Sequence, residues 1–481
     1  MKTKKTHHKV LKHKVLKHKV LKHKVSKHNI SKTKKIYNIN YPRAAILPHA
    51  GKKYAGDARK NILIHFPRYK IKYIIYISAI HDSRDILPGV YQLYKDTTFG
   101  KTPQLPIINK NEHSFDWVEN ELRTHFPNVK IFVLTPVKKY DTQIVKWITT
   151  FISNHPNSVL FSTTDLTHHG KQFNNNILKF PQRLHKQYLE EHLIYSLIQH
   201  PLQLHKIKQY TNQSELLCGP YAIQLFCECV KKINYSGKVV DYYDSHLENN
   251  KLDKYTVTST HIKNIVSYVS IIYGPTINSD KLNNFDIMLA LGSIKSEIIK
   301  KLNNASYSVK LPLWSPFYNM HQGVFVGTSL NGKTNCSYGR YETTNTHKTA
   351  TKIIEAAGDC LLDAKNRWNI PYSNHLLDKL DYKIELLDPK HKWKKYSGKH
   401  TERYFKLNGK QGIYLKLLSG KSATYLPVVA REHKHWTIDK YMENLSEKAG
   451  GNKYDWKKGT IWIYESKSYT WDGNKHKIKL S

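Results

Sequence analysis

Apolar and polar positions along residues 36–274 follow the pattern of an α/β protein, with short apolar runs between longer amphipathic stretches. Because the two kinds of segment alternate, we expect a central sheet that is mainly parallel. The apolar runs predict strands at residues 43–47, 72–78, 130–134, 158–163 and 265–272. The amphipathic stretches predict helices at residues 116–125, 141–153, 184–199 and 220–232.

A turn-rich break at residues 275–278 separates this region from a second one, in which residues 283–302 predict a helix and mixed strands and helices follow. We therefore expect an α/β domain at residues 38–275 and an α+β domain at residues 280–481. A chain of 481 residues is long enough for each to bury its own core. The mean hydropathy of −0.59 and the lack of a long apolar run argue against a membrane span.

Residues 1–35 form a low-complexity tail in which the unit His-Lys-Val-Leu-Lys repeats every five residues. A period of five advances about 140° around a helix, so the Val and Leu positions form no lasting stripe. The tail holds fourteen lysines and no acidic residue, which predicts a disordered segment. Expansion of a short repeat explains it without a specific role, while its charge would attract polyanions such as nucleic acids.

The net charge of +40 is a weak argument for nucleic-acid binding by the folded part. Only ten of the 77 basic residues are Arg, and the abundance of Lys, Asn, Ile and Tyr is typical of an AT-rich genome. The five cysteines are odd in number and widely spaced, so they predict no disulfide framework. With no secretory signal, they favour a reducing, cytoplasmic location.

Reactive side chains follow three of the predicted strands. His49 follows the first strand, His81 the second, and both Asp165 and His168 follow the strand at residues 158–163. A single histidine at such a position is more often structural. Three strand ends together favour a site, because the carboxyl ends of parallel strands meet at one edge of a sheet.

Cys218 adds a fourth candidate, because it stands just before Gly219, Pro220 and a predicted helix. The positive end of the helix dipole favours the thiolate, which is both the nucleophilic and the metal-binding form. Cys227 and Cys229 lie inside that helix and are expected to be core residues.

Six ordered segments resemble the MEMO family over residues 38–275. They are residues 48–56 (PHAGKKYAG), His81, residues 112–114 (EHS), residues 162–168 (STTDLTH), residues 218–219 (CG) and residues 266–268 (VSY). Lys52 replaces a usual aromatic residue, and residues 78–81 (SAIH) replace a Gly-Pro-Ser-His turn.

The remainder of the chain resembles an AMMECR domain, a family often encoded beside or fused to MEMO proteins. The matching segments are residues 323–326 (GVFV), 426–430 (LPVVA) and 448–450 (KAG). The family's hallmark LRGCIG is degraded here to TNCSYG at residues 334–339. The resemblance therefore implies the fold of this domain but not its role.

The MEMO resemblance implies a fold like that of class III extradiol dioxygenases, which are non-haem iron enzymes. It also implies that His49, His81 and Cys218 are metal ligands, a set that suits iron or copper and accepts zinc. Asp165, His168 and His113 would then support the metal site, as orienting or acid–base groups. The family association further implies a radical S-adenosylmethionine protein as a partner.

Two functions remain open on these grounds. The first is a metal-dependent oxidoreductase of the non-haem type. The second is a non-catalytic peptide-binding or adaptor protein that takes a phosphopeptide or another acidic partner, since a fold can outlive its activity. In either case the basic tail at residues 1–35 would add weak, nonspecific nucleic-acid binding.

Overall fold

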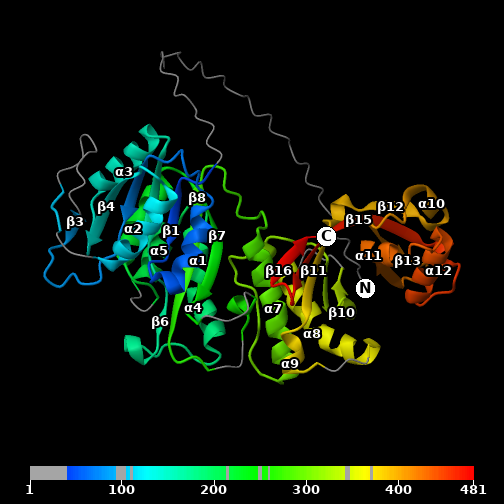
Figure 1. Cartoon of the computed structure of the whole chain (residues 1–481). Coiled ribbons are helices and arrows are strands. Elements are labelled where there is room, and N and C mark those ends of the chain that lie inside the picture. Colours follow the sequence, from blue (N-terminus) through cyan, green and yellow to red (C-terminus); the bar gives the residue numbers. More distant parts are fainter. Residues whose placement is uncertain are drawn as a thin grey trace, which may run out of the picture. The chain divides into compact units, whose positions relative to one another are not determined.

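The computed structural model of the chain contains two β-sheets, each with its own helices (Figure 1). It describes residues 41–93, 105–108, 112–212, 216–246, 252–257, 261–341, 347–368 and 372–480. The predicted disordered tail at residues 1–35 lies outside the described residues.

The first sheet confirms the predicted α/β fold with a parallel centre. Its strands run in the order β3-β4-β2-β5-β1-β8-β6, with β7 also paired to β8. The four strands β4, β2, β5 and β1 are parallel, and the strands at the edges join them antiparallel. Their bounds are β1 Ala44–Leu47, β2 Tyr73–Ile77, β3 Gly89–Gln92, β4 Lys130–Val137, β5 Ser158–Thr163, β6 His168–His169, β7 Ser236–Asp244 and β8 Ile265–Gly274.

Helices cover both faces of this sheet, and the alternation of side chains along β1 shows how. Ala45 and Leu47 pack in one core cluster with side chains of α1 and α2, whereas Ala44 and Ile46 pack in another with α3, α4 and α6. The helices are α1 Lys52–Leu63, α2 His113–His125, α3 Thr142–Asn154, α4 Gln182–Ile198, α5 Leu204–Thr211 and α6 Pro220–Lys232.

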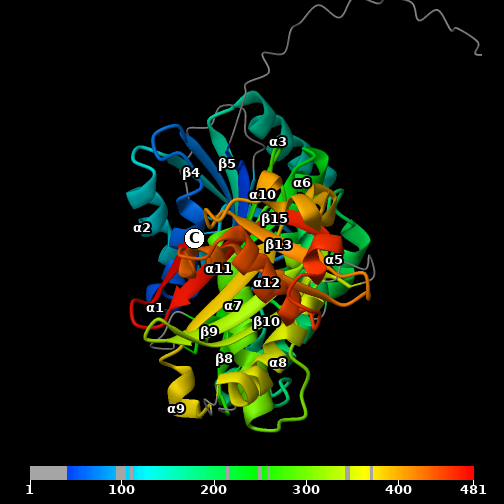
Figure 2. The same ribbon diagram turned by 90° about the vertical axis from the view of Figure 1, so that its right-hand side faces the viewer.

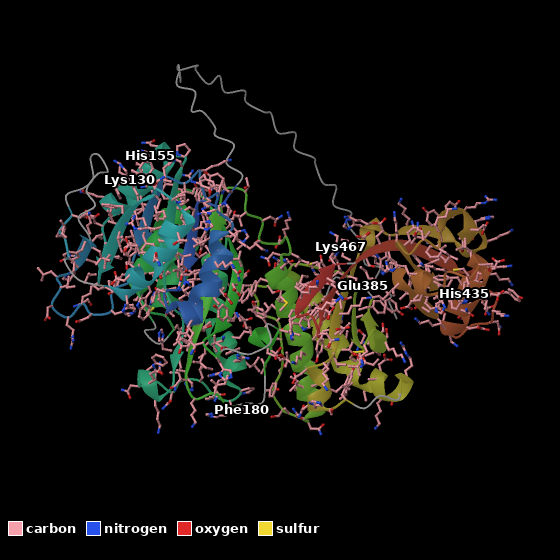
Figure 3. All side chains as sticks on the ribbon, viewed as in Figure 1. Lys130, His155, Phe180, Glu385, His435 and Lys467 are labelled. Carbon is pink, nitrogen blue, oxygen red and sulfur yellow. A yellow bond between two sulfur atoms is a disulfide. The ribbon has the colours of Figure 1, made fainter. Side chains whose placement is uncertain are left out.

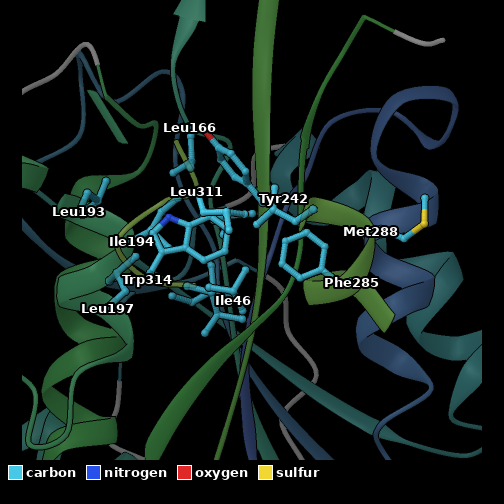
Figure 4. Packing of buried hydrophobic residues seen from close by; sticks show 14 of the residues in the cluster. Ile46, Leu166, Leu193, Ile194, Leu197, Tyr242, Phe285, Met288, Leu311 and Trp314 are labelled. Atoms are coloured by element: carbon cyan, nitrogen blue, oxygen red, sulfur yellow. The ribbon is translucent and has the colours of Figure 1, made fainter. Parts of the chain in front are cut away.

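An aromatic group anchors the larger of these cores. The ring of Trp314 lies 5.5 Å from that of Tyr242 and 6.0 Å from that of Phe285, measured between centroids. Figure 4 shows these rings beside Leu193 and Leu197 of α4. Such a cluster excludes water from one face of the sheet and leaves the carboxyl ends of the strands for polar loops.

The second sheet is wholly antiparallel, in the order β10-β9-β11-β15-β13-β14. The long strand β15 joins its halves: residues 460–465 pair with β13, and residues 466–471 pair with β11. The strands are β9 Val324–Leu330, β10 Lys333–Arg340, β11 Asp381–Leu387, β12 Lys394–Ser397, β13 Gln411–Lys416, β14 Ser422–Tyr425, β15 Thr460–Asp472 and β16 Lys477–Leu480.

The helices of this region include the predicted one at residues 283–302, which the structure confirms as α7 Asn284–Leu302 with a capping box between Asn283 and Asp286. The others are α8 Thr349–Trp368, α9 Asn374–Leu377, α10 Thr401–Tyr404, α11 Pro427–Glu432 and α12 Ile438–Lys448 (Figure 2). Among the described helices, none is both long enough and apolar enough to cross a bilayer.

Cys336 of β10 and Cys360 of α8 form a disulfide, which corrects the expectation drawn from the cysteine count. Both residues are buried, and their Cα atoms are 5.5 Å apart. They lie 24 residues apart in the chain, so their spacing alone gave no reason to pair them.

Candidate metal centre

Three histidines from separate elements meet at the carboxyl edge of the first sheet. His49 stands two residues after β1, His81 four residues after β2, and His113 is the first residue of α2. Each offers a ring nitrogen, and the three nitrogens lie within 4.8 Å of one another. His49 is buried, His113 half-buried and His81 exposed, so the cluster opens to solvent on one side.

This cluster fits a transition-metal ion in its donor chemistry. Neutral imidazole suits iron, copper and zinc. Donor atoms around such an ion are about 3–3.5 Å apart when its bonds are about 2.0–2.1 Å long. The histidines therefore need only small side-chain rotations to reach a common ion.

Glu112 holds two of the three histidines. Its carboxylate accepts hydrogen bonds from His81 Nδ1 at 2.7 Å and from the His81 backbone amide at 3.0 Å, and it lies 3.5 Å from His113 Nδ1. It also caps α2 by accepting from the Ser114 amide. Burial alone would raise the pKa of Glu112, but the hydrogen bonds from His81 and Ser114 outweigh it and hold the pKa at about 2. The ionised carboxylate keeps a proton on His81 Nδ1 and leaves the lone pair of Nε2 available to bind a metal.

Thr163 fixes the ring tautomer of His49 in a similar way. Its hydroxyl donates to the carbonyl of Leu47 at 3.0 Å, so its oxygen accepts from His49 Nδ1, also at 3.0 Å. The lone pair of His49 then lies on Nε2, which faces Cys218 Sγ at 3.2 Å. Burial, followed by the nearby histidines His81 and His113, lowers the pKa of His49 and keeps it in the neutral form that binds metal.

Cys218 lies beside His49 but outside the three-histidine cluster. Its sulfur is 3.2 Å from His49 Nε2 and accepts a hydrogen bond from the Asp165 amide at 3.2 Å. Gly219, with φ of +68°, allows this approach, because a Cβ there would stand 2.5 Å from the Cβ of Ala79. Burial, followed by the charge of Asp165, raises the pKa of Cys218, so the expected thiolate is corrected to a neutral thiol in the metal-free protein.

Asp165 and His168 border the centre without joining the cluster. Asp165 Oδ1 accepts from the backbone amide of His49 at 2.9 Å, and its Oδ2 lies 3.6 Å from His49 Nε2. Burial raises the pKa of Asp165 despite that hydrogen bond. His168, in β6, packs its ring against Phe173 at 5.0 Å. Asp165 thus positions the loop that carries His49.

The sequence placed His49 and His81 at this edge, named Cys218 as the third ligand and His113 only as a supporting group, and gave no role to Glu112 or Thr163. Glu112 was visible only as the first letter of a motif, and Thr163 only as the last residue of a predicted strand. Their partners are 31 and 114 residues away in the chain, so no local pattern could reveal the contacts.

Comparisons with known proteins match two parts of the chain. The model of the Memo-like protein family matches residues 89–261, and the AMMECR1 family model matches residues 288–469. The first span contains His113, Asp165, His168 and Cys218 and begins after His49 and His81. No curated protein sequence matches the chain.

Two solved structures show distant likeness. An uncharacterized protein from Pyrococcus horikoshii is 16% identical, with a TM-score of 0.34, covering 40% of this chain and 94% of its own. An uncharacterized protein from Escherichia coli K12 is 10% identical, with a TM-score of 0.28, covering 48% of this chain and 100% of its own.

Proposed function

The chain joins a Memo-like domain to an AMMECR1 domain, and we propose that its Memo-like part binds a transition metal, iron or copper, for redox chemistry. The observation that carries this proposal is the convergence of three imidazoles, two of which have Nδ1 engaged in a hydrogen bond, so that the lone pair lies on Nε2. Hydrogen bonds that fix the ring tautomer in this way are the usual surroundings of metal-binding histidines.

His49 and His81 are the two constant ligands in this proposal, and the third is His113 or Cys218. His113 is favoured by the mutual spacing of the three rings, and Cys218 by its contact with His49 Nε2. Three protein ligands leave coordination positions open for water, dioxygen or substrate, as a catalytic metal requires. The bound metal would supply electron transfer and Lewis acidity, while Asp165 and Glu112 hold the histidines in place.

Metal analysis of the purified full-length protein tests this. We expect one equivalent of iron or copper in the wild type and in the control His391→Ala, which removes an exposed histidine of the second region. His49→Ala and His81→Ala should each lose most of the metal. Wild-type metal content in the double variant His49→Ala/His81→Ala would remove the proposal.

The third ligand can be identified by cobalt substitution. Ligation by Cys218 gives a sulfur-to-metal charge-transfer band in the near ultraviolet, which Cys218→Ser abolishes and His113→Ala leaves. Ligation by His113 gives no such band, and His113→Ala then lowers the metal affinity while Cys218→Ser does not.

A second candidate function is the binding of an acidic or phosphorylated peptide. Trp117 favours it, because half of its surface is exposed while its ring lies 4.8 Å from that of His113, at the open side of the cluster. Peptide binding that persists after metal removal, and that Trp117→Ala abolishes, would support this function over the oxidoreductase.

A further inference from the structure

The second sheet contains a cavity of about 270 Å³ that the proposed metal chemistry does not use. Strands β9, β10 and β11 and the end of α8 line one side, and β14, α11 and the end of α12 line the other. Four segments noted in the sequence contribute lining residues: 323–326, 334–339, 426–430 and 448–450. Segments that are up to about 120 residues apart thus line one cavity.

Lys448 and Arg367 both line this cavity, as does Lys383, which pairs with Glu385. Lys448 is the last residue of α12, and its ammonium donates to the carbonyl of Thr424 at 3.0 Å and lies 4.8 Å from the ring centroid of Tyr425. Among the described residues, Lys448 pairs with no carboxylate. Arg367 stands in the last turn of α8, where its Nη1 is 3.4 Å from Asp363.

The charges of Lys448 and Arg367 are close enough to interact. Desolvation, followed by repulsion from Arg367, lowers the pKa of Lys448 to about 8. The charge of Asp363 acts in the opposite direction and has a smaller effect on this pKa. Holding two like charges at one cavity costs free energy, and a bound anion would offset that cost.

Of the three cations in the lining, Lys383 pairs with Glu385 and Arg367 with Asp363, which leaves Lys448 without a carboxylate partner among the described residues. Glu385 lies on β11 (Figure 3), where Lys383 approaches it at 2.8 Å and the Ser466 hydroxyl donates to it at 2.6 Å. Glu432 is exposed to solvent. Lys448 and Arg367 are both exposed to solvent, which gives a ligand access to the cavity.

The rest of the lining mixes hydroxyl-bearing residues with a group of apolar side chains. Phe325 comes from β9, and Leu426 and Val429 come from the start of α11. A ligand that fits must therefore combine an anionic group for the two cations with an apolar body for these side chains.

We propose that this cavity binds a small organic anion, with Lys448 and Arg367 holding its carboxylate or phosphate and Phe325, Leu426 and Val429 enclosing its apolar body. The site lies in the AMMECR1 region and does not depend on the metal centre. The proposal assigns a function to segments that otherwise only mark the family.

Calorimetric titration of the full-length protein with benzoate, hexanoate and phenyl phosphate tests this, with benzamide as the neutral counterpart of benzoate. We expect at least one of the anions to bind and benzamide not to bind. The preferred anion then distinguishes a carboxylate site from a phosphate site. Lys448→Met should weaken binding about tenfold or more, because a charge-assisted hydrogen bond is lost. Lys448→Arg should preserve it.

Lys440→Met is the matched control, because Lys440 lies on the same helix, is exposed and does not line the cavity. Its affinity should equal that of the wild type, as should that of His49→Ala, which alters only the metal centre. Thermal unfolding of each variant checks that the fold survives. The proposal is overturned if no anion binds at millimolar concentration, if benzamide binds as tightly as benzoate, or if a folded Lys448→Met variant binds like the wild type.

Discussion

Glu112 shows how a single carboxylate can prepare a metal centre without touching the metal. Its carboxylate accepts hydrogen bonds from both the side chain and the backbone amide of His81, and it lies beside His113 at the start of α2. Its charge is what favours a proton on His81 Nδ1. A neutral amide of the same shape would keep the helix cap but lose this preference.

Glu112→Gln should therefore lower the metal affinity about 10- to 100-fold, the usual effect of removing a ligand's hydrogen-bond partner. Competition against a metal chelator measures this. Glu119→Gln is the control, since Glu119 lies on the same helix and pairs with Arg123 at the surface. Equal affinities of Glu112→Gln and the wild type would show that Glu112 serves the helix alone.

Two of the three clustered histidines, His49 and His81, could be named as ligands from the sequence because each follows a buried strand, whereas His113 was predicted only as a supporting group. His49 and His81 each follow an apolar run by a few residues, and the parallel centre of the sheet brings those runs together. The tautomer of each ring depends instead on Thr163 and Glu112, which reach the rings through space. Rotamers and hydrogen bonds of this kind have no periodic signature in a sequence.

Among the elements, β7 and α4 are joined by a buried ion network around Asp244. Arg183 and Lys186 of α4 both approach Asp244 Oδ2 at 3.1 Å. Burial alone would raise the pKa of Asp244, but the two cations outweigh it and hold the pKa at about 2. The folded state thus favours the ionised carboxylate more strongly than the unfolded state does.

Because this pKa is lowered on folding, the stabilisation is complete above about pH 4 and is lost as the pH falls towards 2. Asp244→Asn should destabilise the protein by about 3–5 kcal/mol at neutral pH, since it leaves two buried cations without their partner. It should also flatten the acid dependence of stability. Urea unfolding of both proteins between pH 2 and 7 measures the two effects, and an unchanged acid dependence would contradict this account.

The disulfide between Cys336 and Cys360 fastens β10 to α8. A crosslink over this separation restricts the unfolded chain and should add about 2–4 kcal/mol of stability. Denaturant unfolding with and without reductant measures it. The variant Cys336→Ala/Cys360→Ala should no longer respond to reductant. Alkylation of both thiols in the unfolded, unreduced protein would show that the bond is absent.

Missed elements have a common physical cause. Helix α1, which packs on the first sheet, and β7, which is one of its strands, are not predicted by the sequence pattern. Arg59 of α1 is fully buried against Glu121, and Lys238 of β7 is buried against Asp286. Because a charged residue counts as polar in a hydrophobicity pattern, α1 and β7 both look more solvent-exposed than they are. The apolar strands β1, β2, β5 and β8 lack such buried charges and matched their predicted ranges closely.

At the scale of the whole molecule, the two family matches lie in one chain, and the boundary expected near residue 277 falls in the gap between them. The boundary itself stays a prediction. The segment between residues 261 and 288 contains the end of β8 and the start of α7, and Lys238 of β7 contacts Asp286 of α7. The turn-rich composition of this segment thus does not prevent packing between β7 and α7 on either side of it.

The distribution of charge leads to a last prediction, which concerns the tail at residues 1–35. Its lysines are not offset by a single acidic residue, whereas residues 36–481 hold 37 acidic side chains against 63 basic ones, and some of these form ion pairs. Binding to a short DNA duplex should therefore come mainly from the tail and weaken steeply with salt, because each neutralised phosphate releases counterions.

Deletion of residues 1–35 should abolish most of this binding and its salt dependence, as measured by fluorescence anisotropy over a range of salt concentrations. The metal content of the truncated protein should match that of the full chain, since none of the clustered histidines lies in the tail. A truncated protein that keeps the same salt dependence would place the nucleic-acid contacts on the folded part. The net charge of +40 would then reflect a binding surface in addition to the composition of an AT-rich genome.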